Sequence, residues 1–180
     1  MHGIIHLELK KFVLATQGAD TWNSLVESAG LTGKRYPAKR AYEDSELLAL
    51  VSSASEALST PVDDILESFG EFIAPDLMSL YSGHVNPAWK TLDFLENAEG
   101  TIHHVVRANE PESTPPRLVA HRESASRVVI EYRSDRKMCA LARGIVRGVA
   151  KQYDEAVHIS EPCCMHKGSG HCEIVVSLKA

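Results

Sequence analysis

The chain has 180 residues, of which 44% are hydrophobic and 24% charged, and its formal net charge is −5. This length suits one globular domain with a sizeable core, so folding needs no disulfide framework. The acidic balance argues against nucleic acid as a partner, because phosphate binding needs clustered Lys and Arg. The sequence shows no membrane-spanning apolar run and no signal peptide. We therefore expect a cytoplasmic protein whose four cysteines serve as metal ligands or redox thiols.

The first hundred residues carry helical patterns. Apolar residues recur at helical spacing from Ile5 to Thr16, and further helices are expected to begin near Asp20, Asp44 and Pro61. A later helix should run from about residue 91 to 107. The segment 109–116 contains three prolines, so it must be a loop.

After this loop the pattern changes to that of a sheet. Strands are predicted at 118–121, 128–132, 157–160 and 172–178, and a helix at 138–153. The sequence therefore predicts an α+β fold, in which a helical N-terminal half packs on a C-terminal antiparallel sheet that carries a helix. We expect one domain over 1–180, with a helical subdomain at about 1–60 and an α/β subdomain at about 61–180.

The sharpest motif is Tyr132-Arg-Ser134-Asp-Arg136. On an extended strand these three side chains would point the same way, at steps of about 6–7 Å. Two hydroxyls and a guanidinium aimed at one place suit a pair of carboxylates or a phosphate. The spacing alone also fits an edge strand with a polar solvent face.

Three features occur together in this chain: the Tyr-x-Ser-x-Arg motif, a histidine 29 residues before its tyrosine, and the start Met-x-Gly-Ile-Ile. With Trp22, the Phe69-Gly70-x-Phe72 segment and the C-terminal Cys-Met-His-x-Gly stretch, they make the whole chain similar to H-NOX (haem nitric-oxide/oxygen-binding) domains. These domains are the sensor modules of soluble guanylate cyclase and its bacterial relatives. The resemblance implies a standalone bacterial nitric oxide sensor, not an enzyme, with haem b in a pocket between the helical part and the sheet.

The resemblance also implies roles for individual residues. His103 would be the proximal iron ligand, and Pro116 would press on the macrocycle. Helical periodicity alone favours His103 over the neighbouring His104 only slightly. Nitric oxide would break the bond between iron and His103, so that the two subdomains shift. The haem propionates would be bound by Tyr132, Ser134 and Arg136.

The distal side of the pocket is expected to lack a hydrogen-bond donor. H-NOX branches that bind dioxygen place a Tyr hydroxyl at the position matching Ala140, which favours nitric oxide selectivity here. Ala140 and Gly144 are small, so the pocket is either roomier than in relatives or closed by Leu141 and Met78. The matching positions are Ile5, Leu9, Ala74, Met78, Ala140 and Gly144.

The cysteines suggest a second metal. One H-NOX branch has zinc at the positions matching Cys139, Cys164 and Cys172, together with a histidine where this chain has Glu161. Metal-free thiols and a reversible disulfide are the alternatives. The candidates for a fourth zinc ligand are Cys163, His166, His171 and Glu161.

The output is expected to lie in a separate signalling protein, because the chain contains no kinase, cyclase or methyl-accepting segment. The resemblance to standalone members implies a histidine kinase or a cyclic-di-GMP enzyme. An alternative function is a haem-free module that senses redox state through zinc or binds a small apolar molecule, with a distant likeness to 4-vinyl-reductase-type domains. A zinc hydrolase is disfavoured, since catalytic zinc keeps an open position.

Overall fold

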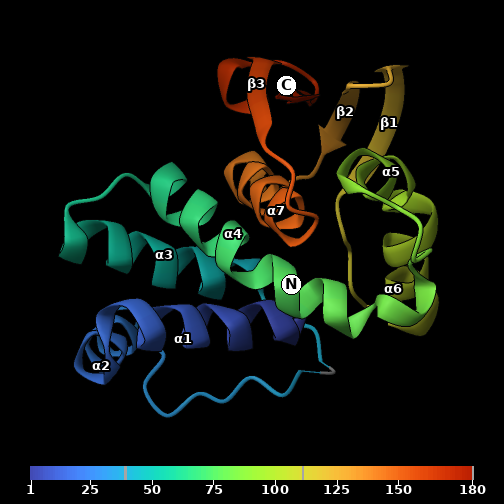
Figure 1. The fold of residues 1–180 in the computed structure, drawn as a ribbon. Helices are drawn as coiled ribbons and strands as arrows, with labels where there is room; N and C mark the ends of the chain where they lie inside the picture. Colours follow the sequence, from blue (N-terminus) through green and yellow to red (C-terminus); the bar gives the residue numbers. More distant parts are fainter. Residues whose placement is uncertain (39, 111, 180) are drawn as a thin grey trace.

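Helices form the N-terminal part of the chain and a sheet with further helices the C-terminal part in the computed structural model, which describes residues 1–38, 40–110 and 112–179 (Figure 1). The longer helices are α1 (Gly3–Gln17), α2 (Ala19–Ser28), α3 (Asp44–Leu58), α4 (Val62–Leu80) and α7 (Cys139–Gln152). Shorter elements are the 3-10 turns Ser82–His84 and Met165–Lys167, α5 (Thr91–Asn97), a π-helical turn (Glu99–His103) and α6 (His104–Asn109). The strands are β1 (Arg117–Ser124), β2 (Arg127–Arg133), β3 (Val157–Cys163) and β4 (Cys172–Leu178).

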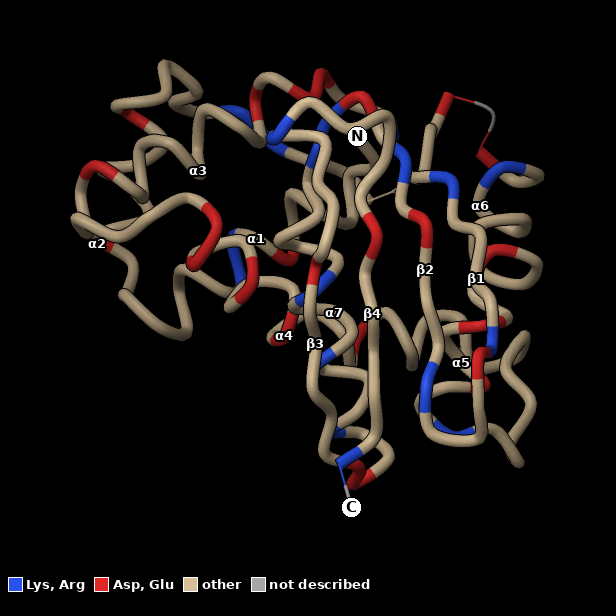
Figure 2. The backbone as a smooth tube through the Cα atoms, turned by 90° about the horizontal axis from the view of Figure 1, so that it is seen from above, with Lys and Arg blue, Asp and Glu red and all other residues tan. Residues whose placement is uncertain are grey.

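The four strands form one antiparallel sheet in the order β1-β2-β4-β3 (Figure 2). Helices α5 and α7 pack against one face, and α1 to α3 lie beside the sheet (Figures 1 and 2). The α+β prediction is confirmed. The helix predicted over 91–107 is interrupted, because the π turn separates α5 from α6.

The buried apolar side chains form two clusters. The first fills the space between α1, α2, α3 and α4, with Leu9 and Phe69 among its members. The second lies between α5, α7 and the sheet and includes Val128 and Ile174. Helices α4 and α7 contribute to both, so they join the two parts of the molecule. Among the described residues, no helix combines the length and apolar character needed to cross a bilayer.

Helices α4 and α7 approach each other through small residues. A Cβ atom built on Gly144 would lie 2.1 Å from the Glu67 carbonyl oxygen, and one built on Gly70 would lie 2.3 Å from the Leu141 carbonyl oxygen. A Cβ on Gly148 would meet the Cβ of Ala74 at 2.4 Å. The small residues on α7 therefore permit close contact between two helix backbones.

We expect Gly144→Ala to destabilise the protein by about 3 kcal/mol, because the added methyl group must push α4 and α7 apart. For a domain of this size that corresponds to a fall in Tm of roughly 6–12 °C. Thermal unfolding followed by circular dichroism measures the change. Gly83→Ala is the matched control, since nothing lies within 4 Å of the Cβ it adds. Equal Tm values for the two variants would contradict the close crossing.

Candidate functional site

A mainly apolar cavity lies between the two parts of the molecule. Its volume, taken as the space open to the centres of water molecules, is about 230 Å³. The space available to ligand atoms is larger, because such centres stay about 1.4 Å from the walls. His103, Tyr132 and Arg136 supply polar groups to the lining. The apolar wall includes Ile5, Met78, Ile102, Leu141, Ile145 and Val146.

His103 is the histidine of the adjacent pair that faces this cavity. It ends the π turn, and its backbone N–H donates to the Ala98 carbonyl oxygen at 3.1 Å. Its Nδ1 lies 2.9 Å from Oε2 of Glu99, so Nε2 is left for a metal. His104 is exposed and is not part of the cavity lining. The structure thus distinguishes two residues that periodicity alone hardly separated.

Glu99 holds His103 in place and was missed in the sequence. Besides the imidazole, its carboxylate accepts the Leu118 N–H at 3.2 Å and pairs with the Arg107 guanidinium. Burial by itself would raise the pKa of Glu99, but the hydrogen bonds from His103 and Leu118 and the charge of Arg107 hold that pKa below its usual value. The i,i+4 spacing of Glu99 and His103 on a helix was the available signal.

The motif residues Tyr132, Ser134 and Arg136 do not share one extended strand, so that prediction is wrong. Strand β2 ends at Arg133, and a turn follows in which the Lys137 N–H donates to the Ser134 carbonyl oxygen at 3.0 Å. The Ser134 hydroxyl accepts the Arg136 N–H at 3.3 Å. Burial raises the pKa of Tyr132 to about 12, although the Ser134 hydroxyl opposes this shift. The turn therefore brings Arg136 to the cavity that Tyr132 also lines.

Arg136 connects the cavity with the helical part. Its guanidinium donates to Asp44 Oδ2 at 3.2 Å, to Thr114 Oγ1 at 3.1 Å and to the Thr114 carbonyl oxygen. Asp44, at the start of α3, also pairs with the Met1 ammonium group at 2.7 Å. Arg136 and Pro116 line the cavity, whereas Ser134 does not.

Three of the residues expected on the cavity wall, Leu9, Ala140 and Gly144, do not line it. Leu9 and Ala140 are buried in the first apolar cluster and do not line the cavity. On a helix, one residue corresponds to a rotation of about 100°, so Leu141 lines the cavity while Ala140 faces away from it. Ile5, Ala74 and Met78 do line it. Leu141 and Met78 thus line the cavity, whereas Gly144 is small because the backbone of Glu67 on α4 packs against it.

Tyr81 adds a hydroxyl to the lining that the sequence analysis overlooked. It follows the last residue of α4 and lines the cavity. Burial raises its pKa, so the phenol keeps its proton at neutral pH. A phenol can donate a hydrogen bond, which makes Tyr81 the residue to examine if a polar ligand is stabilised there.

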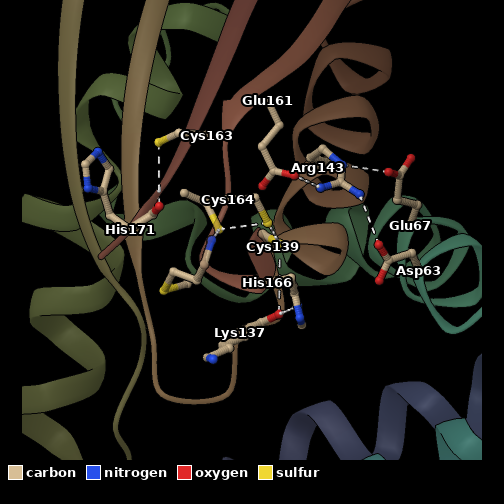
Figure 3. Close-up of polar contacts among 12 residues, drawn as sticks. Asp63, Glu67, Lys137, Cys139, Arg143, Glu161, Cys163, Cys164, His166 and His171 are labelled. Atoms are coloured by element: carbon tan, nitrogen blue, oxygen red, sulfur yellow. Dashed lines mark hydrogen bonds and ion pairs between the residues drawn. The ribbon is translucent and has the colours of Figure 1, made fainter. Parts of the chain in front are cut away.

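Three buried thiols and one carboxylate form a separate group beside α7 (Figure 3). The Cys164 Sγ lies 3.7 Å from that of Cys139 and 3.6 Å from that of Cys172. A carboxylate oxygen of Glu161 completes the group, whose ligand atoms all lie within 4.8 Å of one another. The four cysteines are free. These donor types and their spacing could hold a metal ion.

Glu161 is the fourth-ligand candidate that joins the thiols. Its Oε2 accepts from Arg143 at 2.6 Å, whereas its buried Oε1 has no hydrogen-bond partner among the described residues. His166 instead has Nε2 2.7 Å from the Lys137 carbonyl oxygen. Cys163 and His171 belong to a different group of possible ligands.

Burial raises the pKa of the Cys139 and Cys172 thiols, that of Cys172 to about 11. Without a metal these thiols therefore stay protonated at neutral pH. A metal ion that binds here must displace their protons, so acid must weaken its binding.

The family model described as Haem-NO-binding matches residues 2–161. An H-NOX protein from S. oneidensis, solved in the Fe(II)NO ligation state, has a TM-score of 0.93 and 27% identity, with 100% of both chains covered. An Fe(II) unliganded H-NOX protein from K. algicida shares the fold, with a TM-score of 0.90, 21% identity, and 100% of this chain and 97% of that chain covered. Soluble guanylate cyclase gcy-32 of Caenorhabditis elegans is 28% identical over 160 residues, which is 84% of this chain and 23% of that protein. The chain spans about a quarter of the length of the curated relatives it matches.

Proposed function

Because the chain belongs to the Haem-NO-binding family, the H-NOX domains of haem-based gas sensors, we propose that it senses nitric oxide through a haem b held by His103. One observation carries the proposal: His103 and Arg136 line the same apolar cavity. An imidazole suits iron, a guanidinium suits carboxylates, and an apolar wall suits the macrocycle.

The residues present fit a haem group. His103 would offer Nε2 to the iron, because Nδ1 is already engaged by Glu99. The propionates would take donors from Tyr132 and Arg136, which line the cavity, and from Ser134, which lies in the turn between them. Arg136 would then exchange its contact with Asp44 for a ligand carboxylate. Pro116, on the cavity wall, would limit how flat the macrocycle can lie.

A haem held here would supply an iron that can bind nitric oxide, and His103 would be the protein ligand whose bond to that iron depends on the gas. The chain responds through the restraints on His103. Glu99 ties the imidazole to β1 through the Leu118 N–H and to α6 through Arg107. Release of His103 would therefore change the restraints on both β1 and α6. We propose that subdomains at about 1–60 and 61–180 then rotate relative to each other, which is a two-state response biased by ligand.

The part of the cavity wall that α7 forms favours nitric oxide over dioxygen. Leu141 and Ile145, which face the cavity from α7, offer no hydrogen-bond donor. Bound dioxygen carries partial negative charge and gains from a donor, whereas nitric oxide binds ferrous haem without one. Tyr81 is the hydroxyl on the wall whose position tests this selectivity.

We propose that the output is a separate signalling protein, either a histidine kinase or a cyclic-di-GMP enzyme. The proposal includes no catalysis by this chain. Its support is the resemblance of the chain to standalone bacterial members of the family.

A visible spectrum tests the haem and its ligand. We expect the purified ferrous protein to show a Soret band that shifts with nitric oxide and to form no stable oxy complex in air. His103→Gly should abolish haem retention unless imidazole is supplied, because the variant lacks the nitrogen ligand. His104→Gly is the matched control and should retain haem.

Three other results would each contradict a part of this prediction. Colourless protein that haemin cannot reconstitute would overturn haem binding and favour the haem-free redox or apolar-ligand module. A stable oxy complex that Tyr81→Phe abolishes would overturn nitric oxide selectivity. Normal haem retention by His103→Gly would reassign the ligand.

Glu99→Gln tests whether the carboxylate strengthens the iron ligand. A hydrogen-bonded carboxylate makes an imidazole more basic, and such partners are worth about 10–100-fold in metal affinity. We expect a lower iron–imidazole stretching frequency in the resonance Raman spectrum and haem loss faster by on the order of 10-fold. Glu96→Gln is the control, because Glu96 pairs with Arg122 instead. An unchanged iron–imidazole stretching frequency in haem-loaded Glu99→Gln would refute the role of Glu99. It would not contradict haem binding by His103.

We also propose that Cys139, Cys164, Cys172 and Glu161 hold a structural or redox zinc. With Zn–S bonds of about 2.3 Å, tetrahedral geometry places two thiolates about 3.8 Å apart. The Sγ separations of 3.6 and 3.7 Å are close to that value. The unpartnered Oε1 of Glu161 supports a ligand at the same place. The zinc-bearing branch of the family has a histidine where this chain has Glu161.

We expect Cys164→Ala to lose the zinc that wild type retains through dialysis, as measured by metal analysis. His166→Ala is the control, because His166 lies outside the group, with Nε2 near the Lys137 carbonyl oxygen, and it should keep that zinc. Lowering the pH should release zinc from wild type, since the thiols must be deprotonated to bind. Retention by Cys164→Ala would remove Cys164 from the ligand set.

A further inference from the structure

The outer side of the β3–β4 hairpin carries a second group of metal-ligating side chains. Cys163, His171 and Glu173 each offer one ligand atom, and these atoms lie within 4.8 Å of one another. All three residues are half-buried, in contrast to the fully buried thiols of the inner group. In Figure 3 Cys163 and His171 lie on one side of the strands, and Cys139, Cys164 and Glu161 lie on the other.

A β-bulge places Cys163 in this group. Ser160 pairs with Val175, but Cys163 pairs with Glu173, so three steps along β3 match two along β4. Successive residues of a strand point to opposite faces, and one extra residue reverses that alternation. The bulge therefore puts Cys163 on the face of Glu173 and leaves Cys164 facing inward.

The surroundings favour a cation. Glu173 lies directly opposite Glu131 of β2 in the sheet register. Like charges placed opposite each other in a sheet repel, which is unfavourable for the folded state. Glu131 is partly compensated by Arg133 at 3.2 Å. A bound cation would relieve the same repulsion from the side of Glu173.

We propose that Cys163, His171 and Glu173 form a second zinc site, distinct from the inner thiol group and independent of haem. Sulfur, nitrogen and oxygen donors match the preferences of Zn²⁺, and three protein ligands leave a fourth position open to water or an external ligand. Ligand atoms around tetrahedral zinc lie about 3.5 Å apart, which modest rotations of half-exposed side chains can reach. Because the site is accessible, its zinc exchanges with solvent while the inner zinc does not.

Zinc binding to the purified full-length chain tests the site. We expect wild type to bind two equivalents of zinc, one of which a brief treatment with a chelator removes. Cys163→Ser and His171→Ala should each weaken the chelator-labile equivalent by at least about 100-fold, since even indirect partners of a metal are worth 10–100-fold. Both should leave the retained equivalent unchanged. Circular dichroism confirms that each variant is folded.

Two controls separate the outer site from other sources of zinc binding. His158→Ala removes an exposed histidine of β3 outside the group, and it should keep both equivalents. Cys139→Ser should lose the retained equivalent and keep the labile one. Wild type without a chelator-labile equivalent, or a labile equivalent that survives in Cys163→Ser and His171→Ala together, would overturn the proposal, whereas loss of the retained equivalent alone would contradict only the inner site.

Discussion

The close crossing of α4 and α7 is the constraint on which both candidate sites depend. Gly70 on α4 and the glycines of α7 allow the two backbones to touch. One side of α7 packs against α4, and another side forms part of the cavity wall. Cys139, the first residue of α7, belongs to the inner thiol group. A wider crossing would alter the cavity and the thiol geometry together.

Ion pairs extend this link to the sheet. Arg143 of α7 contacts Glu67 of α4 at 2.7 Å and Glu161 of β3 at 2.6 Å. Glu161 thus serves an ion pair and the thiol group at once. A metal ion that drew on the charge of Glu161 would weaken its pairing with Arg143. The state of the thiol group is in this way connected to α4, which like α7 contributes to both apolar clusters.

Much of the fold could be predicted from local patterns. Helical periodicity, the prolines before β1 and the alternating strands gave the α+β arrangement, because each is a property of neighbouring residues. The cavity residues His103, Tyr132 and Arg136 were also anticipated, through the combination of motifs that mark the family. That all three line one cavity depends on the tertiary structure and follows only from it.

The errors arose where one residue changes the direction of a side chain. The turn after Arg133, rather than a continued strand, positions Arg136. A single step along α7 separates Ala140, which does not line the cavity, from Leu141, which does, although both belong to the first apolar cluster. The π turn that presents His103 has no signal in hydrophobic periodicity. Hydrophobic periodicity does not specify such details, because it reports which face of an element is apolar and not how a single turn is formed.

The bulge in β3 has a consequence for how the two adjacent cysteines are sorted. The inserted stretch contains Pro162, which lacks the amide proton that regular pairing would use, and β3 is an edge strand where proline is tolerated. If the strand paired without the bulge, Cys163 would turn inward and Cys164 outward. The bulge around Pro162 thus determines which of two adjacent thiols is buried in the interior and which stays partly accessible to solvent.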